Sequence, residues 1–177
     1  CWCFFFQAEY GLRGYDVTGV QPCALLLTGR GREISTGFTT GCNMANFTGL
    51  AAARHALLAR AGWDVEAQGL FGAPEINVVV GAEAHGSIFA GLQMLGLGRD
   101  RVIRVAADDQ GRMRADALAA TLDGLSGPVI VIAQAGNVNS GAFDPFMPIA
   151  DACKAPDALL HVDRAFRPLG AAPKSAG

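Results

Sequence analysis

Asp163 is the residue of this sequence that most clearly suggests chemistry, because it ends the apolar run Leu159-Leu160-His161-Val162. In an open α/β sheet, ligands gather at the carboxyl ends of the strands, so a polar residue that ends a buried strand is a candidate site residue. A buried carboxylate without a partner is costly, and Asp163 therefore needs a cationic partner. The alternative is structural, with Asp163 bonded to loop amides or paired with Arg164 or Arg167.

A small polar turn comes directly before the first clear helical pattern. Its sequence is Thr39-Thr40-Gly41-Cys42-Asn43-Met44-Ala45-Asn46. Exposed N–H groups and the positive end of the helix dipole make such a turn suitable for a phosphate, and the small residues permit close approach. Thr and Asn also serve as ordinary N-caps, so a helix start without a ligand is the alternative.

His85 lies just after the apolar run Ile76-Asn77-Val78-Val79-Val80 and just before a helical pattern that begins at Gly86. A neutral imidazole at that place could stack on a flat ring or relay a proton. The alternative is a histidine that serves only the structure.

A polar loop, Ala135 to Pro145, follows the apolar run that ends near Ala133. Its amides, its glycines and the Asp144-Pro145 step indicate an ordered loop at the carboxyl end of a strand. A turn without a ligand is the alternative for this loop.

Strand and helix patterns alternate from Thr36 onward. Short β-branched or apolar runs predict strands, and apolar residues at helical spacing predict helices. We expect, in chain order, a helix near 42–61, a strand over 76–80, a helix over 86–95, a strand over 102–105, a helix around 118–125, a strand over 128–133, a helix near 146–154 and a strand over 159–163. This alternation predicts an α/β domain with a mostly parallel sheet and helices on both faces.

Composition favours a globular domain with a small-molecule ligand. The 177 residues are 51% hydrophobic and 17% charged with a net charge of -2, and no basic face stands out, so we expect neither nucleic acid nor membrane as a partner. No stretch approaches the roughly 20 apolar residues that cross a bilayer, and we expect a cytoplasmic protein. The five cysteines fit neither a disulfide framework nor a zinc site, and we expect no metal.

The four features, taken together and in order, resemble the group II pyridoxal-phosphate (PLP)-dependent amino-acid decarboxylases, the family of aromatic-amino-acid, histidine and glutamate decarboxylases. The resemblance runs from about Thr36 to Phe166 and is most specific in 135–145 and in His161-Val162-Asp163. It implies the large domain of a fold type I, aminotransferase-like PLP enzyme, and a homodimeric parent that decarboxylates an amino acid. The alternatives are another fold type I PLP enzyme, such as an aminotransferase or a carbon-sulfur or carbon-carbon lyase, and an inert fragment that is no enzyme.

The resemblance implies that Cys42 and Asn43 occupy the turn that holds the cofactor phosphate, and that His85, the catalytic candidate, stacks on the pyridine ring. This chain departs from the family at Gly41-Cys42-Asn43, because the family usually has two glycines and then a serine or threonine there.

The resemblance also implies that Asn137 and Val138 lie in the loop that lines the cofactor, that Asp163 binds the protonated ring nitrogen and that Ala165 lies beneath the ring. A carboxylate next to the pyridinium keeps it charged, and the charged ring accepts the electrons that remain on the substrate when carbon dioxide departs.

The two ends of the chain lack these patterns. Residues 1–30 have neither strand nor helix periodicity and resemble a translated sequencing-adapter remnant, with an ordinary N-terminal arm as the alternative. We predict a partial PLP-binding large domain over 31–167 and a loop-like truncated tail over 168–177. The Schiff-base lysine of the family is expected beyond Gly177, since Lys174 has no adjacent histidine, and the chain alone is therefore expected to be inactive.

Overall fold

The fold is built on a seven-stranded sheet with the strand order β3-β2-β1-β7-β6-β4-β5. The computed structural model describes residues 3–5, 23–28, 34–154, 156 and 158–164. Strands β1, β7, β6, β4 and β5 are parallel neighbours, and β2 pairs antiparallel with both β1 and β3. The strands are β1 (Cys3–Phe5), β2 (Cys23–Thr28), β3 (Ile34–Thr39), β4 (Asn77–Gly81), β5 (Ile103–Val105), β6 (Val129–Gln134) and β7 (Leu159–Asp163).

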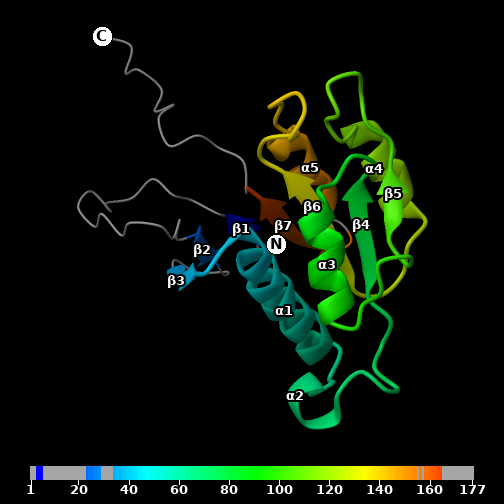
Figure 1. Ribbon diagram of the computed structural model, residues 1–177. Helices are drawn as coiled ribbons and strands as arrows, with labels where there is room; N and C mark the ends of the chain where they lie inside the picture. Colours follow the sequence, from blue (N-terminus) through cyan, green and yellow to red (C-terminus); the bar gives the residue numbers. More distant parts are fainter. Residues whose placement is uncertain (1–2, 6–22, 29–33, 155, 157, 165–177) are drawn as a thin grey trace.

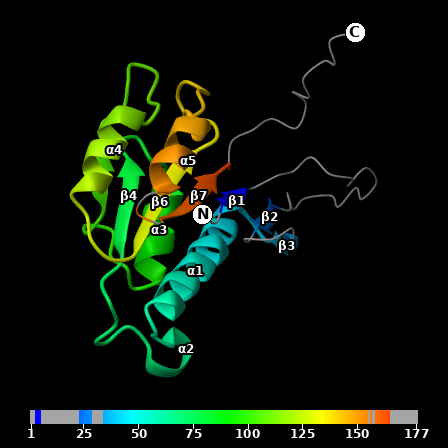
Figure 2. The same cartoon turned by 180° about the vertical axis from the view of Figure 1, so that it is seen from behind.

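Helices cover both faces of this sheet (Figures 1 and 2). Helices α1 (Cys42–Arg60) and α3 (Gly86–Met94) lie on one face, and α4 (Ala115–Asp123) and α5 (Phe146–Lys154) lie on the other. A short helix, α2 (Val65–Gln68), follows α1. The predicted α/β architecture, a mostly parallel sheet with helices on both faces, is confirmed.

The strands supply two separate cores because successive side chains of a strand point to opposite faces. On the face of α1 and α3 the strand side chains in the core are Val78, Val80, Ile130, Ile132 and Leu159. On the face of α4 and α5 they are Val79, Val105, Val129, Val131, Ala133, Leu160 and Val162. Burial on both faces explains why β4 and β6 are continuous apolar runs in the sequence.

Glycines end α1 and α3. The N–H of Gly62, at φ +77°, bonds to the carbonyl of Ala59, and the N–H of Trp63 bonds to the carbonyl of Leu58, which is the Schellman pattern at the end of α1. Gly96 ends α3 in the same way, at φ +73°. Within the described part of the chain, no helix has both the length and the apolar character needed to cross a bilayer.

Strands β1 and β2 come from residues 1–30, for which the sequence predicts no regular structure. Cys3 pairs in parallel with Leu160 of β7 and antiparallel with Thr28 of β2. The division into 1–30, 31–167 and 168–177 stays a prediction, and the segment 168–177 lies outside the described residues.

Candidate functional site

Asp163 is the last residue of β7, a central strand between β1 and β6. Its side chain is buried, and its carbonyl oxygen accepts the N–H of Ala135 at 2.7 Å. Leu159 packs in the core of α1 and α3, and His161 bonds to α1, so Asp163 follows them onto that face by strand alternation. A buried carboxylate therefore lies at the carboxyl end of a central strand, on the face of α1 and α3.

The N-terminus of α1 begins on the same face. Its N-cap is Gly41, no described side chain caps it, and its first turn holds no acidic residue. The first N–H groups of a helix have no intrahelical acceptor, so this end can bind an anion. A Cβ added to Gly41 would meet no atom within 4 Å, and Cys42 is half-buried whereas Asn43 is exposed.

His85 is the half-buried N-cap of α3. Its Nδ1 accepts the backbone N–H of Ser87 at 3.2 Å and lies 2.9 Å from Ser87 Oγ. The imidazole thus takes the place that serine or aspartate fills at most helix N-termini. This contact fixes one edge of the ring against the start of α3.

A chain of buried hydrogen bonds joins these elements. Asn46 Nδ2 donates to Ser87 Oγ at 3.2 Å, and Asn46 Oδ1 lies 3.0 Å from His161 Nε2. Asn46, Ser87 and His161 are all buried. The structure therefore connects β7, two residues before Asp163, through α1 to the histidine that begins α3.

His161 is a neutral member of that chain. Its side chain is fully buried, and desolvation lowers its pKa to about 3. A neutral imidazole carries one N–H, and the partner at Nε2 is the oxygen of Asn46. His161 thus donates from Nε2 and adds no charge beside Asp163.

Asn137 organises the loop after β6. Its Oδ1 accepts the N–H groups of Asn139 and Ser140 at 2.8 and 3.2 Å, and its Nδ2 donates to Glu83 Oε2 at 3.1 Å. The amide is buried and ties this loop to the loop after β4, whereas Val138 beside it is 49% exposed. Of the two predicted loop residues, Val138 is the one with an exposed side chain.

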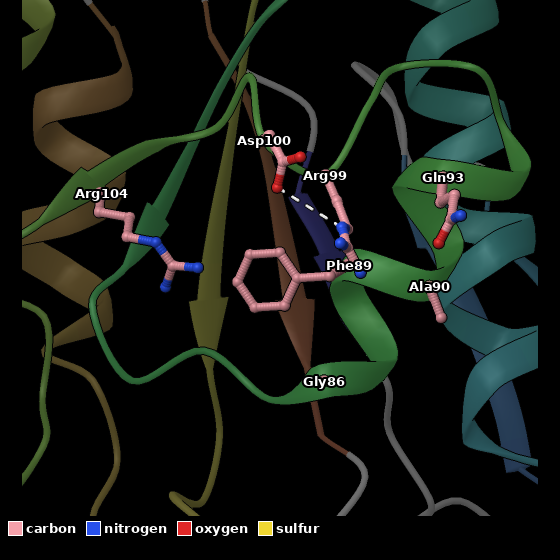
Figure 3. A pocket seen from close by; sticks show the side chains of 7 residues that line it. All are labelled: Gly86, Phe89, Ala90, Gln93, Arg99, Asp100 and Arg104. Atoms are coloured by element: carbon pink, nitrogen blue, oxygen red, sulfur yellow. Dashed lines mark ion pairs between the residues drawn. The ribbon is translucent and has the colours of Figure 1, made fainter.

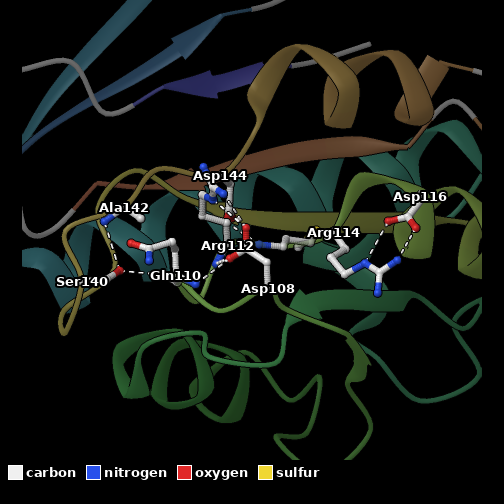
Figure 4. Close-up of polar contacts among 9 residues, drawn as sticks. Asp108, Gln110, Arg112, Arg114, Asp116, Ser140, Ala142 and Asp144 are labelled. Atoms are coloured by element: carbon white, nitrogen blue, oxygen red, sulfur yellow. Dashed lines mark hydrogen bonds and ion pairs between the residues drawn. The ribbon is translucent and has the colours of Figure 1, made fainter.

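Asp144 (Figure 4) is a second buried carboxylate, and two main-chain N–H groups hold it. It accepts the N–H of Met113 at 2.7 Å and the N–H of Gln134 at 2.6 Å. Burial raises its pKa, although these two bonds act in the opposite direction. Ser140 Oγ adds a bond to the carbonyl of Gln110 at 2.6 Å, so the loops after β5 and β6 are joined.

An open hollow of about 450 Å³ is lined by residues of α3, of β5 and of the turn between them (Figure 3). Arg104 lies over the ring of Phe89 there, 4.7 Å from its centroid, and Arg99 pairs with Asp100 at 3.5 Å. The lining residues are Gly86, Phe89, Ala90, Gln93, Arg99, Asp100 and Arg104. None of the predicted site residues lines this hollow.

The structure places the turn before α1, His85 and Asp163 on one face of the sheet. It ties Asn137 to Glu83, and Ala165 lies outside the described residues. Ser87, which links His85 to α1, is a site residue that was not predicted from the sequence. Its position two residues after a histidine that begins a helix is the signal that could have found it.

Comparisons with known proteins agree on one family. The model of the pyridoxal-dependent decarboxylase conserved domain matches residues 28–172. L-2,4-diaminobutyrate decarboxylase of Rhizobium meliloti (strain 1021) is 36% identical over 151 residues, which are 83% of this chain and 28% of that protein. Cysteine sulfinic acid decarboxylase of Rattus norvegicus is 39% identical over 108 residues, which are 58% of this chain and 22% of that protein. The chain spans about a quarter of the length of these curated relatives.

Solved structures give the same result. The crystal structure of mouse CSAD matches with a TM-score of 0.65 and 33% identity, over 71% of this chain and 26% of that one. The structure of Oryza sativa TDC with PLP and tryptamine matches with a TM-score of 0.57 and 25% identity, over 68% of this chain and 25% of that one.

Proposed function

The chain belongs to the pyridoxal-dependent decarboxylase family, and from this premise we propose that the protein containing it is a PLP-dependent carboxy-lyase that releases carbon dioxide from an amino acid. The observation that carries the proposal is the common placement of three groups on one sheet face. These are the uncapped start of α1, the imidazole of His85 and the carboxylate of Asp163.

The donor set of this face suits PLP. The uncapped N–H groups at the start of α1, with Cys42 and Asn43, would hold the phosphate. Asp163, a buried carboxylate at the carboxyl end of β7, would bind the protonated ring nitrogen. His85 would stack on the ring, Val138 would line it from the loop after β6, and Asn137 would hold that loop in place.

The residues act by holding charge and orientation. Bound PLP supplies a ring that accepts the electrons left on the substrate α-carbon when carbon dioxide departs. Asp163 would keep the proton on the ring nitrogen, because a carboxylate favours a neighbouring cation. His85 would pack against the ring, and the start of α1 would neutralise part of the phosphate charge.

The Schiff-base lysine is proposed to lie in a part of the protein outside these 177 residues. Lys154 is on α5, on the opposite face of the sheet from α1, where it pairs with Asp151 at 2.5 Å. It belongs to the wrong face for a reaction beside Asp163.

The substrate is proposed to be an amino acid of the kind that the relatives' names indicate, and the protein is proposed to act as a cytoplasmic homodimer. L-2,4-diaminobutyrate and cysteine sulfinic acid, taken from those names, are the first two compounds to test.

The test is product analysis with the full-length protein that contains this chain. We expect PLP-dependent release of carbon dioxide and of an equal amount of amine from one of the candidate amino acids. His85→Ala is expected to lower kcat strongly. Thr48→Ala serves as the control and is expected to keep the wild-type kcat, because the half-buried Thr48 bonds within α1, to the carbonyl of Met44. Formation of a keto acid without carbon dioxide would favour an aminotransferase and overturn the proposal.

A further inference from the structure

A series of hydrogen bonds connects His85 with β7, α1 and α3. It runs from His161 on β7 to Asn46 on α1, then to Ser87 and His85 at the start of α3, with contacts of 3.0, 3.2 and 2.9 Å. We call these four residues the relay. Asn46, Ser87 and His161 are between 0% and 5% exposed, so water does not replace their bonds. Buried polar groups of this kind are costly to leave without partners.

The protonation of His85 follows from one main-chain bond. The backbone N–H of Ser87 is always a donor, and it points at Nδ1 of His85 at 3.2 Å. Nδ1 must therefore present its lone pair. A neutral imidazole then carries its proton on Nε2.

The side chains of the relay agree with that assignment. His161 donates from Nε2 to Asn46 Oδ1, which leaves Nδ2 of the amide to donate to Ser87 Oγ. Ser87 Oγ then has its own hydrogen to give to His85 Nδ1. In each bond the donor thus lies on the side of His161 and the acceptor on the side of His85.

The anchor of the relay does not change charge near neutral pH. Burial lowers the pKa of His161 to about 3, so its Nε2 stays a donor of a neutral ring. The donor at His161 Nε2 fixes the orientation of the Asn46 amide, and that amide fixes the orientation of the Ser87 hydroxyl.

We infer that Asn46 and Ser87 are positioning residues that hold His85 in one ring orientation and as the Nε2-protonated neutral tautomer. The tautomer follows from the bonds alone. Its consequence for the cofactor rests on the proposed function, in which the oriented imidazole stacks on the PLP ring and presents Nε2–H as its one donor.

The tautomer is tested without cofactor, by nitrogen-15 NMR of labelled histidine in this chain. The sequence has three histidines, and His55→Gln removes the exposed one, so that signals of His85 and His161 remain. We expect His85 to show a protonated Nε2 and an unprotonated Nδ1. Protonation of Nδ1 in the wild-type chain would overturn the inference.

Two variants test the direction of the relay. Asn46→Asp keeps an acceptor for His161 but has no hydrogen for Ser87, so the hydroxyl of Ser87 turns toward the new carboxylate and leaves His85. Ser87→Ala removes the hydroxyl and keeps the backbone N–H. Both are expected to shift the Nδ1 signal of His85, and Thr48→Ala, whose hydroxyl bonds to Met44 within α1, is expected not to. Unchanged Nδ1 signals in both variants would contradict the relay.

The second readout uses the full-length protein with PLP. Loss of one positioning bond is expected to weaken PLP binding about fivefold, to change the visible circular dichroism of the bound cofactor, and to lower kcat at saturating PLP with little change in KM. Ser87→Thr, which keeps a hydroxyl, is expected to restore part of the dichroism. Variants that keep wild-type dichroism and kcat would overturn the positioning role.

The two readouts separate this inference from the proposed function. A full-length protein that binds no PLP contradicts the proposed function, while the nitrogen signals of His85 still decide the tautomer. Far-UV circular dichroism identifies a variant that fails to fold, and the milder Ser87→Ala variant then decides the role of the relay.

Discussion

His161 Nε2 lies 3.0 Å from Asn46 Oδ1, and this buried contact joins the middle of β7 to the first turns of α1. Since burial lowers the pKa of His161 from 6.5 to about 3, the folded protein keeps this ring neutral while the unfolded chain takes up a proton. We therefore expect the free energy of unfolding to fall as the pH is lowered from about 6.5 toward 3, with a limiting slope of about 1.4 kcal/mol per pH unit.

The check is urea unfolding of this chain and of His161→Asn over that pH range. Asp144 acts in the opposite direction, because its raised pKa favours proton uptake by the folded state as the pH falls. It is present in both proteins, so the difference between them isolates His161. Equal pH dependence of the two proteins would contradict a buried neutral His161.

Gly111→Ala is expected to destabilise the protein by about 2–4 kcal/mol. A Cβ at Gly111 would lie 2.5 Å from Glu83 Oε2 and 2.6 Å from Asn137 Nδ2, and its φ of +74° disfavours alanine as well. Gly141→Ala is the matched control, since its φ is +70° but its Cβ would meet no atom within 4 Å, and we expect it to cost about 1 kcal/mol. Thermal unfolding measures both variants. Equal losses of stability in Gly111→Ala and Gly141→Ala would show that Gly111 is not tightly packed against Asn137 and Glu83.

Asp144→Ala is expected to cost about 2–4 kcal/mol, because it leaves the buried N–H groups of Met113 and Gln134 without their acceptor. Asp144→Asn keeps one acceptor oxygen and is expected to cost less. Urea midpoints measure both variants. If Asp144→Ala loses no more stability than Asp144→Asn, the carboxylate oxygens do not act as the acceptors described here.

Much of this fold could be predicted because the strand signals are strong. Val129 to Ala133 is apolar on both faces, and the buried parallel strand that such a run predicts is present as β6. Strands β1, β2 and β3 and the four-residue helix α2 were not predicted, since their segments are short or lack a clear period.

The site could be predicted less fully, because its links are long-range. Asn46 and His161 are 115 residues apart, and Asn46 and Ser87 are 41 apart, so no local pattern indicates their contacts. The hydrogen bond from Asn137 to Glu83 is also long-range, because it joins two loops that meet only in the folded chain.

Asn43→Asp distinguishes a phosphate site from an ordinary helix start. A carboxylate in the first turn of α1 interacts favourably with the positive end of the helix dipole. We therefore expect a gain of about 0.5 kcal/mol in the stability of this chain. The same charge would repel a phosphate, and PLP binding by the full-length protein should weaken about tenfold. Gln93→Glu, on the exposed side of α3, controls for net charge. A gain in stability with unchanged PLP affinity would place the phosphate elsewhere.

The proposed role of Asp163 is tested most directly by PLP binding and carbon dioxide release of Asp163→Asn in the full-length protein. We expect weaker PLP binding and a decrease in kcat of about 100-fold, because the ring nitrogen would lose the carboxylate that keeps it protonated. Asp116→Asn, on α4 on the opposite face and paired with Arg114, is the matched control and should match the wild type. Wild-type PLP affinity and wild-type carbon dioxide release in Asp163→Asn would contradict the proposed role of Asp163.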